Sequence, residues 1–367
     1  MSETFIRAHI DSLPHDVTYI YGYQNRCSWE DKPLRQIDPV ASVPRPKWLD
    51  LLPRVLEFRL SRKWYPTQSD DDILERFLRK NQIEVVLAEY GTTASFITPI
   101  CRKLGIPLVA HFHGIDASHY KVLNDFKEGY RALFDYASTI VAVSNAMKEN
   151  LVAEGCAAEK IICNPCSPAD HFFEISPNYE SNTILAVGRQ TAKKAPYLTL
   201  DAFRLAVERR PELRLCLIGD GELSEVSENL VKAWGLQDKV DLVGAAEPAQ
   251  IQAKMRESFL FVQHSIRAKN GDSEGMPVAV MEASAAGLPV VSTKHAGIPE
   301  VIQNDMNGFV VEPGDTQSMA KHIVQLADDR GLCQKLGQEG RRLVAENFSM
   351  EKHIQRLDEA LCSAAKR

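Results

Sequence analysis

The chain has 367 residues, which at about 150 residues per domain predicts two domains rather than one. Hydrophobic residues make up 44% and charged residues 25%, and glycine (20) and proline (19) are too few for a collagen-like or low-complexity chain. The formal net charge of −6 excludes a protein that binds nucleic acid through a bulk basic surface.

The sequence carries no sign of export or of membrane insertion. No apolar run approaches the roughly 20 residues of a membrane span. Residues 1–6 lack both the basic and the apolar region of a secretory signal. The 8 cysteines are far below the density of disulfide scaffolds, which favours a reducing compartment. We therefore expect a cytoplasmic protein.

Short β-branched runs alternate with helix-length segments along the chain. Residues 2–10 are predicted to form a helix with Ser2 as its N-cap. Strand-like runs follow at residues 17–20, 83–87, 107–110, 139–143, 183–187, 213–218, 240–243, 259–262, 289–291 and 309–311. This alternation is typical of βαβ units, and so many runs suit two doubly wound α/β domains with parallel sheets better than one. Since such a domain normally opens with a strand, we expect that its first strand is missing before Ser2.

Between residues 31 and 66 the first half has a proline-rich, tryptophan-containing insertion. Its residues 45–65 combine arginine and lysine with tryptophan, leucine and phenylalanine in a basic amphipathic pattern. One interpretation is a peripheral contact with an anionic membrane surface, on the inner face of the membrane. The other is a proline-interrupted helix packed on its own domain.

Two patterns of the first half are weak candidates for metal sites. Asp70–Asp72 contains Asp-x-Asp, by which some sugar transferases hold a divalent metal, but Ser69 before it favours a capped helix start. His111 and His113 point to one face of their strand, as a metal pair would, but the sequence names no third ligand. His113 also lies at the carboxyl end of a parallel strand, where such sheets bind ligands. Structural burial of either histidine is the alternative.

The segment 163–182 is the best candidate for the domain boundary, which we place near residue 170. It is proline-rich and separates the two series of strand-like runs. It begins with Cys163-Asn-Pro-Cys166, the spacing of a redox or half-zinc motif. Because no second pair accompanies it, a loop between elements is the favoured interpretation.

The most informative pattern of the second half is the loop and helix of residues 271–287. Pro277 suits the first position of a helix, and the amides at such a helix end bind anions. A diphosphate is therefore expected at this helix end. Glu282, inside the helix, is placed to hold the vicinal hydroxyls of a ribose, and Glu274 those of a second sugar. The alternatives are a loop charge for Glu274 and a solvated helix face for Glu282.

A second candidate anion site follows the run 183–187. Gly188 permits close approach of the backbone, while Arg189 and Lys194 supply positive charge without a metal. The alternative is a solvated basic loop.

The stretch Gly219–Ser224 half-matches the dinucleotide fingerprint Gly-x-Gly-x-x-Gly. Its third glycine is absent, and no suitably placed acid follows about 20 residues later. A tight strand–helix turn is therefore favoured over a dehydrogenase site.

Together these motifs resemble the retaining GT-B glycosyltransferases of family GT4, in particular the bacterial exopolysaccharide enzymes of the colanic-acid type. The resemblance runs along the whole chain and departs from the family pattern at Ala195, where glycine often follows the lysine. It rests on His113-Gly-Ile-Asp116, Val143-Ser-Asn145, Gly188-Arg189 with Lys194, Gly219-Asp-Gly221, Glu274-x7-Glu282, Gly287-Leu-Pro-Val-Val291, Gly297-Ile-Pro-Glu300, Asn307-Gly308 and Pro313-x-Asp315.

The resemblance implies two Rossmann-like domains that face an interdomain cleft. The first, acceptor-side domain would comprise residues 1–170 and a last helix, 348–367, that crosses back to it. Residues 171–347 would bind a nucleotide-sugar donor. The donor-binding residues that it implies are Gly188, Arg189, Lys194, Gly275, Met276, Pro277, Val278 and Glu282.

The resemblance also implies roles at the reacting sugar. Glu282 would hold the ribose, and Glu274 the hydroxyls of the transferred sugar. His113 would lie near the anomeric centre and the C6 hydroxyl, so His113 and Glu274 are the catalytic candidates. Arg189 and Lys194 would stabilise charge that develops on the leaving diphosphate, the task that a metal performs elsewhere.

We therefore expect a metal-independent, retaining hexosyltransferase without a cofactor, whose donor is a UDP-sugar and in the first place UDP-glucose. Its acceptor would be a saccharide or a lipid-linked saccharide in the synthesis of exopolysaccharide or cell-envelope polysaccharide. Two rivals remain: a non-catalytic sugar-nucleotide-binding component of an assembly complex, and an NAD-dependent oxidoreductase built on Gly219–Ser224. No nucleic-acid partner is expected.

Overall fold

The computed structural model describes residues 4–21, 28–31, 35–36 and 68–366. The chain divides into two compact units, one of residues 1–110, 128–140 and 357–367 and the other of residues 111–127 and 141–356. No helix of the described ranges has both the length and the apolar character needed to cross a bilayer. The basic stretch 45–65 lies outside the described residues, so its membrane contact stays a prediction, as does the boundary near residue 170.

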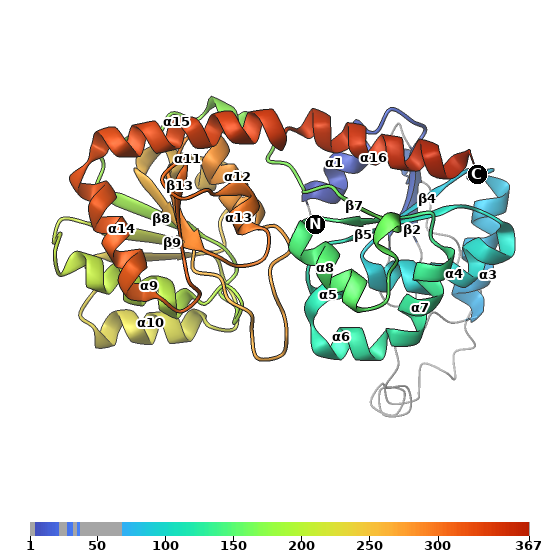
Figure 1. The fold of residues 1–367 in the computed structure, drawn as a ribbon, viewed down its shortest axis with the longest axis horizontal. Coiled ribbons are helices and arrows are strands. Elements are labelled where there is room, and N and C mark those ends of the chain that lie inside the picture. Colours follow the sequence, from blue (N-terminus) through green and yellow to red (C-terminus); the bar gives the residue numbers. More distant parts are fainter. Residues whose placement is uncertain (1–3, 22–27, 32–34, 37–67, 367) are drawn as a thin grey trace. The chain divides into compact units, whose positions relative to one another are not determined.

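The first half of the chain contains a four-stranded sheet with the order β4-β5-β6-β7 and a small sheet with the order β1-β2-β3 (Figure 1). Its elements are α1 (Thr4–Ser12), β1 (Thr18–Tyr21), β2 (Ser28–Asp31), β3 (Arg35–Gln36), α3 (Gln68–Lys80), β4 (Val86–Glu89), α4 (Gly91–Leu104), β5 (Leu108–Phe112), α5 (Ile115–Ser118), α6 (Tyr120–Asp125), α7 (Lys127–Tyr136), β6 (Thr139–Ala142), α8 (Asn145–Ala153), the 3-10 helix η2 (Ala158–Lys160) and β7 (Ile161–Cys163).

One strand of this half departs from the expected parallel series. The run predicted at residues 17–20 is β1, which pairs antiparallel with β2. Residues 22–27, which join the two strands, are too few for the crossover that a parallel pair requires. The helix expected at residues 2–10 is α1, which begins at Thr4; Ser2, its predicted N-cap, lies outside the described residues. The helix α3 begins at Gln68, so Asp70–Asp72 lies in the first turn of a helix, as expected, but Ser69 lies inside that helix and is not its N-cap.

The second half is built around one six-stranded sheet with the order β10-β9-β8-β11-β12-β13, in which every neighbouring pair is parallel. Its elements are the 3-10 helix η3 (Asp170–Glu174), β8 (Thr183–Val187), α9 (Pro196–Val207), β9 (Arg214–Ile218), α10 (Ser224–Ala233), β10 (Val240–Gly244), α11 (Pro248–Glu257), β11 (Leu260–Val262), α12 (Val278–Ala285), β12 (Val290–Thr293), α13 (Ile298–Val301), β13 (Gly308–Val311), α14 (Thr316–Asp328), α15 (Arg330–Asn347) and α16 (Met350–Ala365).

This strand order has one switch point. From β8 the chain proceeds through β9 to β10 on one side, and from β11 through β12 to β13 on the other. In Figure 1, α9 and α10 lie along the lower side of this sheet, and α12 and α15 along its upper side. The doubly wound interpretation is therefore confirmed, and ligands of such sheets bind beyond the carboxyl ends of the strands at the switch point.

Apolar side chains fill both faces of this sheet. Phe203 and Leu200 of α9 are fully buried, as are Phe259 and Leu260 at the start of β11. Burial of a large apolar side chain contributes about 1.5–3 kcal/mol, so this core provides a rigid support for the loops at the switch point.

The last helix, α16, contacts residues of the first half, as expected. Asn164 donates a hydrogen bond from Nδ2 to the backbone oxygen of His353, at 3.0 Å. Further along α16, Asp358 forms an ion pair with His15.

Candidate active site

The predicted donor-binding residues lie on two loops at the switch point, except Val278 and Glu282, which lie on the helix α12 that follows the second loop. Residues 188–195 connect β8 to α9, and residues 263–277 connect β11 to α12. Both loops leave the carboxyl ends of adjacent, parallel strands, because β11 pairs directly with β8. The strand order thus brings together two sequence motifs that are about 80 residues apart, at the position where such folds bind ligands.

An ion pair joins the two loops. Nζ of Lys194 lies 3.1 Å from Oε1 of Glu274, and the two side chains are only 16% and 8% exposed. The same ammonium lies 3.4 Å from Oε1 of Gln263, at the end of β11. Burial by itself would raise the pKa of Glu274, but the charges of Lys194 and Lys193 outweigh it and hold the pKa below its ordinary value. Glu274 is therefore an ionised carboxylate, held on its loop by Lys194, and its role toward a sugar stays a prediction.

Glu282 differs from Glu274 in its protonation. It lies on α12 with intermediate exposure, between the fully buried residues Met281 and Ala283, and its place at a ribose stays a prediction. Burial raises the pKa of Glu282 to about 7, against the opposing charge of Lys194. A carboxyl with this pKa changes its charge within the physiological range.

The helix start differs in one detail from the expectation. Pro277 is not the first helical residue: its backbone is extended, with ψ 108°, and α12 begins at Val278. The carbonyl of Pro277 accepts a hydrogen bond from the amide of Val280, at 3.0 Å. Since the first amides of an α-helix have no acceptor within it, those of Val278 and Ala279 are the ones available to an anion.

His113 is held beside the second loop by its backbone. Its amide donates to Oδ1 of buried Asp116 at 3.0 Å, and the amide of Gly114 donates to the same oxygen at 2.8 Å. A Cβ on Gly275 would lie 2.3 Å from the carbonyl oxygen of His113, so only glycine permits this approach. The structure thus brings His113 next to the loop that carries Glu274, within one compact unit.

Arg189 is not part of this network. The residue is exposed, and in the described ranges its guanidinium has no ion pair with Glu274 or Glu282. Its role as a diphosphate ligand stays a prediction.

Sequence reasoning missed the residues that support the site. Buried Lys193 forms an ion pair with Asp272, at 3.0 Å, and donates to the carbonyl of Ser273, at 3.3 Å. The Lys193-Lys194 pair is visible in the sequence. A loop has no periodicity, however, so the sequence does not show which of the two lysines contacts which acidic residue. Ala195 has a left-handed backbone, with φ 40°, a conformation that glycine adopts more readily than alanine.

The glycine-rich turn after β9 packs against the loop of residues 188–195. A Cβ on Gly219 would lie 1.9 Å from the carbonyl oxygen of Gly188, and one on Gly221 would lie 2.5 Å from that of Gln190. The amide of Gln190 is also bonded to the carbonyl of Asp220, at 2.9 Å. The tight-turn interpretation of this motif is therefore confirmed, because its glycines make room for protein backbone.

Gly219→Ala is expected to lower the free energy of unfolding by about 3 kcal/mol, since it combines a steric overlap with a left-handed backbone, φ 136°. Urea denaturation measures this loss. Gly235→Ala is the matched control, because Gly235 has φ 66° but nothing within 4 Å of an added Cβ, and we expect a loss of about 1 kcal/mol. Equal losses in the two variants would contradict the packing argument.

Comparisons with known proteins identify the family to which the chain belongs. The family model "Glycosyltransferase Family 4" matches residues 6–166, and "Glycosyl transferases group 1" matches residues 169–343. The amylovoran biosynthesis glycosyltransferase AmsK of Erwinia amylovora is 30% identical over 293 residues, which cover 76% of this chain and 71% of AmsK. The putative colanic acid biosynthesis glycosyltransferase WcaL of Escherichia coli is 31% identical over 246 residues, 65% of this chain and 60% of WcaL.

The structural likeness extends to most of the chain. A crystal structure of HepE from Anabaena in complex with UDP-glucose superimposes with a TM-score of 0.70 and 20% sequence identity. The match covers 80% of this chain and 82% of HepE, and at this identity it reports on the fold alone.

Proposed function

This chain belongs to the group 1 glycosyltransferases of family 4, and from that premise we propose that it transfers a hexose from a UDP-sugar, without a metal and with retention of the anomeric configuration. The fold expected for the family, GT-B with Rossmann-like α/β domains, is confirmed by the likeness to HepE and by the doubly wound sheet. The transferase activity follows from membership; donor, stereochemistry and metal independence are the proposal.

The observation that carries the proposal is the ion pair between Lys194 and Glu274, with Glu282 on the following helix. A nucleotide sugar presents a ribose diol, two phosphates and a sugar with several hydroxyls. Lys194 and the amides of Val278 and Ala279 match the phosphates, and two carboxylates match the two groups of hydroxyls. UDP-glucose is our first choice of donor because HepE, which shares the fold, binds UDP-glucose.

We assign the side chains to parts of the donor by their charge and by their position. Ionised Glu274 accepts hydrogen bonds from hydroxyls of the transferred sugar, while the imidazole of His113 lies near its anomeric carbon. The bond from the anomeric carbon to the phosphate oxygen breaks as the acceptor oxygen bonds to that carbon on the same face. The acceptor's proton passes to the departing phosphate oxygen. Lys194 and Arg189 stabilise the negative charge that develops on UDP, so no metal is required.

The acceptor class is proposed from the relatives. AmsK acts in amylovoran biosynthesis, and WcaL is a putative enzyme of colanic acid biosynthesis. We propose a saccharide or lipid-linked saccharide acceptor in the synthesis of an exopolysaccharide. For a lipid-linked acceptor, residues 45–65 are the proposed membrane contact.

The proposal is tested by following release of the nucleoside diphosphate from a panel of nucleotide sugars, with and without EDTA. We expect turnover of UDP-glucose, at rates that differ by less than about twofold between the two conditions. Release that stops in EDTA would contradict metal independence, and preference for a GDP-sugar would contradict the donor. Binding of UDP-glucose without any release would favour the non-catalytic rival.

The affinity for UDP-glucose is expected to rise as the pH increases through about 7, the pKa of Glu282. The ionised carboxylate accepts hydrogen bonds from the ribose hydroxyls better than the protonated acid does, and the donor itself does not titrate in this range. Glu282→Gln is expected to weaken binding by about tenfold and to remove the pH dependence. Calorimetric titration between about pH 5.5 and 8.5 measures both; a flat profile for the wild-type protein would contradict the assignment.

A further inference from the structure

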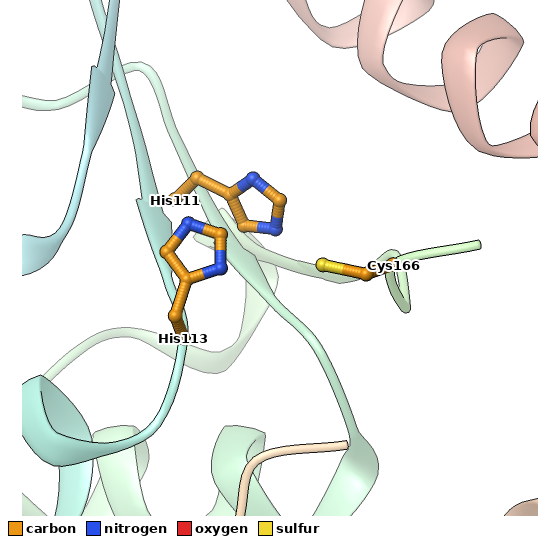
Figure 2. Close-up of side chains that lie close together, drawn as sticks. All are labelled: His111, His113 and Cys166. Atoms are coloured by element: carbon orange, nitrogen blue, oxygen red, sulfur yellow. The ribbon is translucent and has the colours of Figure 1, made fainter. Parts of the chain in front are cut away.

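Two histidines and a cysteine lie together at the end of β5. His111 and His113 point to the same face of the strand, and their ring centroids are 4.2 Å apart. Figure 2 shows the sulfur of Cys166, from the segment after β7, pointing toward the two imidazole rings. One ligand atom from each of the three side chains lies within 4.8 Å of the others. The third ligand that the sequence does not name is therefore supplied by the fold.

The chemistry of the three side chains determines which metal ions they can bind. Two imidazole nitrogens and a thiolate are ligands for Zn²⁺ and neighbouring late transition metals, and a poor set for Mg²⁺ or Ca²⁺. Ligand atoms around one tetrahedral Zn²⁺ are about 3.5 Å apart, so small side-chain rotations close the present cluster onto an ion. His111 and Cys166 are buried, whereas His113 is partly exposed and offers the path of entry.

Cys163, the other cysteine of the motif, has a different role. Its Sγ lies 3.3 Å from Oδ1 of Asn145 and does not belong to the cluster. The Cys-x-x-Cys motif thus brings one cysteine, and not both, to the cluster.

We propose that His111, His113 and Cys166 bind one Zn²⁺ ion, and that the bound ion inhibits sugar transfer. The inhibitory part rests on the proposed function, because it takes the imidazole of His113 away from the sugar. On binding, the thiol of Cys166 loses its proton to solvent and both imidazoles bind as neutral ligands. Three protein ligands leave the fourth position to water. The metal is an inhibitor here, in agreement with an enzyme that needs no metal for turnover.

Binding is tested on the full chain with Co²⁺, a spectroscopic substitute for Zn²⁺, after treatment with EDTA and removal of the chelator. We expect one equivalent of Co²⁺ to give a thiolate-to-cobalt charge-transfer band in the near ultraviolet, which Zn²⁺ abolishes. Cys166→Ser is expected to lose the band and to bind Zn²⁺ at least about 100-fold more weakly. Cys163→Ser is the matched control and is expected to keep both. A wild-type spectrum without the band, or a band that persists in Cys166→Ser, would overturn the site; the wild-type spectrum decides this even if a variant fails to fold.

Inhibition of sugar transfer by Zn²⁺ is measured separately, as the rate of UDP release from UDP-glucose. One equivalent of Zn²⁺ is expected to lower the wild-type rate at least tenfold, and EDTA is expected to restore it. Cys166→Ser is expected to have the wild-type basal rate and to resist Zn²⁺. If cobalt binds through Cys166 but the rate is unchanged by Zn²⁺, the inhibitory part is wrong. If no donor is turned over at all, the proposed function fails while the cobalt spectrum still decides the metal site.

Discussion

Lys194→Ala is expected to lower kcat/KM for sugar transfer about 10³-fold while the fold is retained. Negative charge builds up on the diphosphate as its bond to the sugar breaks. One hydrogen-bond donor held in a fixed position toward such charge increases the rate by a factor of about 10²–10³. Lys194 is only 16% exposed, so water cannot replace its ammonium effectively. The rate of UDP release under subsaturating donor measures the loss.

The same substitution leaves Glu274 buried without its ion-pair partner, which lowers stability by a separate route. The double variant Lys194→Met/Glu274→Gln removes both charges with little change in volume, and we expect it to recover Tm but not activity. Lys294→Ala is the matched control, because it removes an exposed ammonium that is paired with Glu312. Wild-type kcat/KM in folded Lys194→Ala would show that this lysine does not stabilise the leaving group.

His113→Ala is expected to lower kcat at least about 10²-fold, with little change in the KM for UDP-glucose. The side chain is assigned to the reacting carbon and not to the nucleotide, and one polar group fixed where charge develops contributes a factor of about 10²–10³. Stability is expected to change little, because the backbone of this loop is held by Asp116 and by contact with Gly275. Initial rates over a range of donor concentrations separate kcat from KM.

The control for this substitution is His171→Ala, which removes an exposed imidazole in the same unit and is expected to leave both constants unchanged. Thermal unfolding of His113→Ala verifies that its fold is retained. An unchanged kcat with a raised KM would assign His113 to donor binding and contradict its place at the anomeric carbon.

The sequence was sufficient to predict the sheet of the second half and to place the candidate residues at one edge of that sheet. Each of its strands is a short β-branched run, so the hydrophobic pattern locates β8 and β11 within a residue. The candidate residues Lys194 and Glu274 were found because they follow these two runs, where a doubly wound fold binds ligands. Their ion pair follows from the strand order, which the motifs do not contain.

Other features depend on contacts that local sequence does not encode. The run at residues 17–20 has ordinary strand character, and only its pairing with β2 makes it antiparallel. Pro277 lies one residue before the first helical position that proline favours, and its carbonyl accepts a hydrogen bond from the amide of Val280. Cys166 and His111 are 55 positions apart in the numbering, and the fold alone places them within reach of one ion.

The most direct test of the account is a ¹H NMR time course of UDP-glucose with the enzyme in EDTA and without added acceptor. Slow transfer to water then releases glucose, whose first-formed anomer reports the stereochemistry before mutarotation. We predict α-glucose as the first product, together with an equal amount of UDP. First-formed β-glucose, or no reaction until a divalent metal is added, would contradict the metal-independent, retaining transfer proposed for this chain.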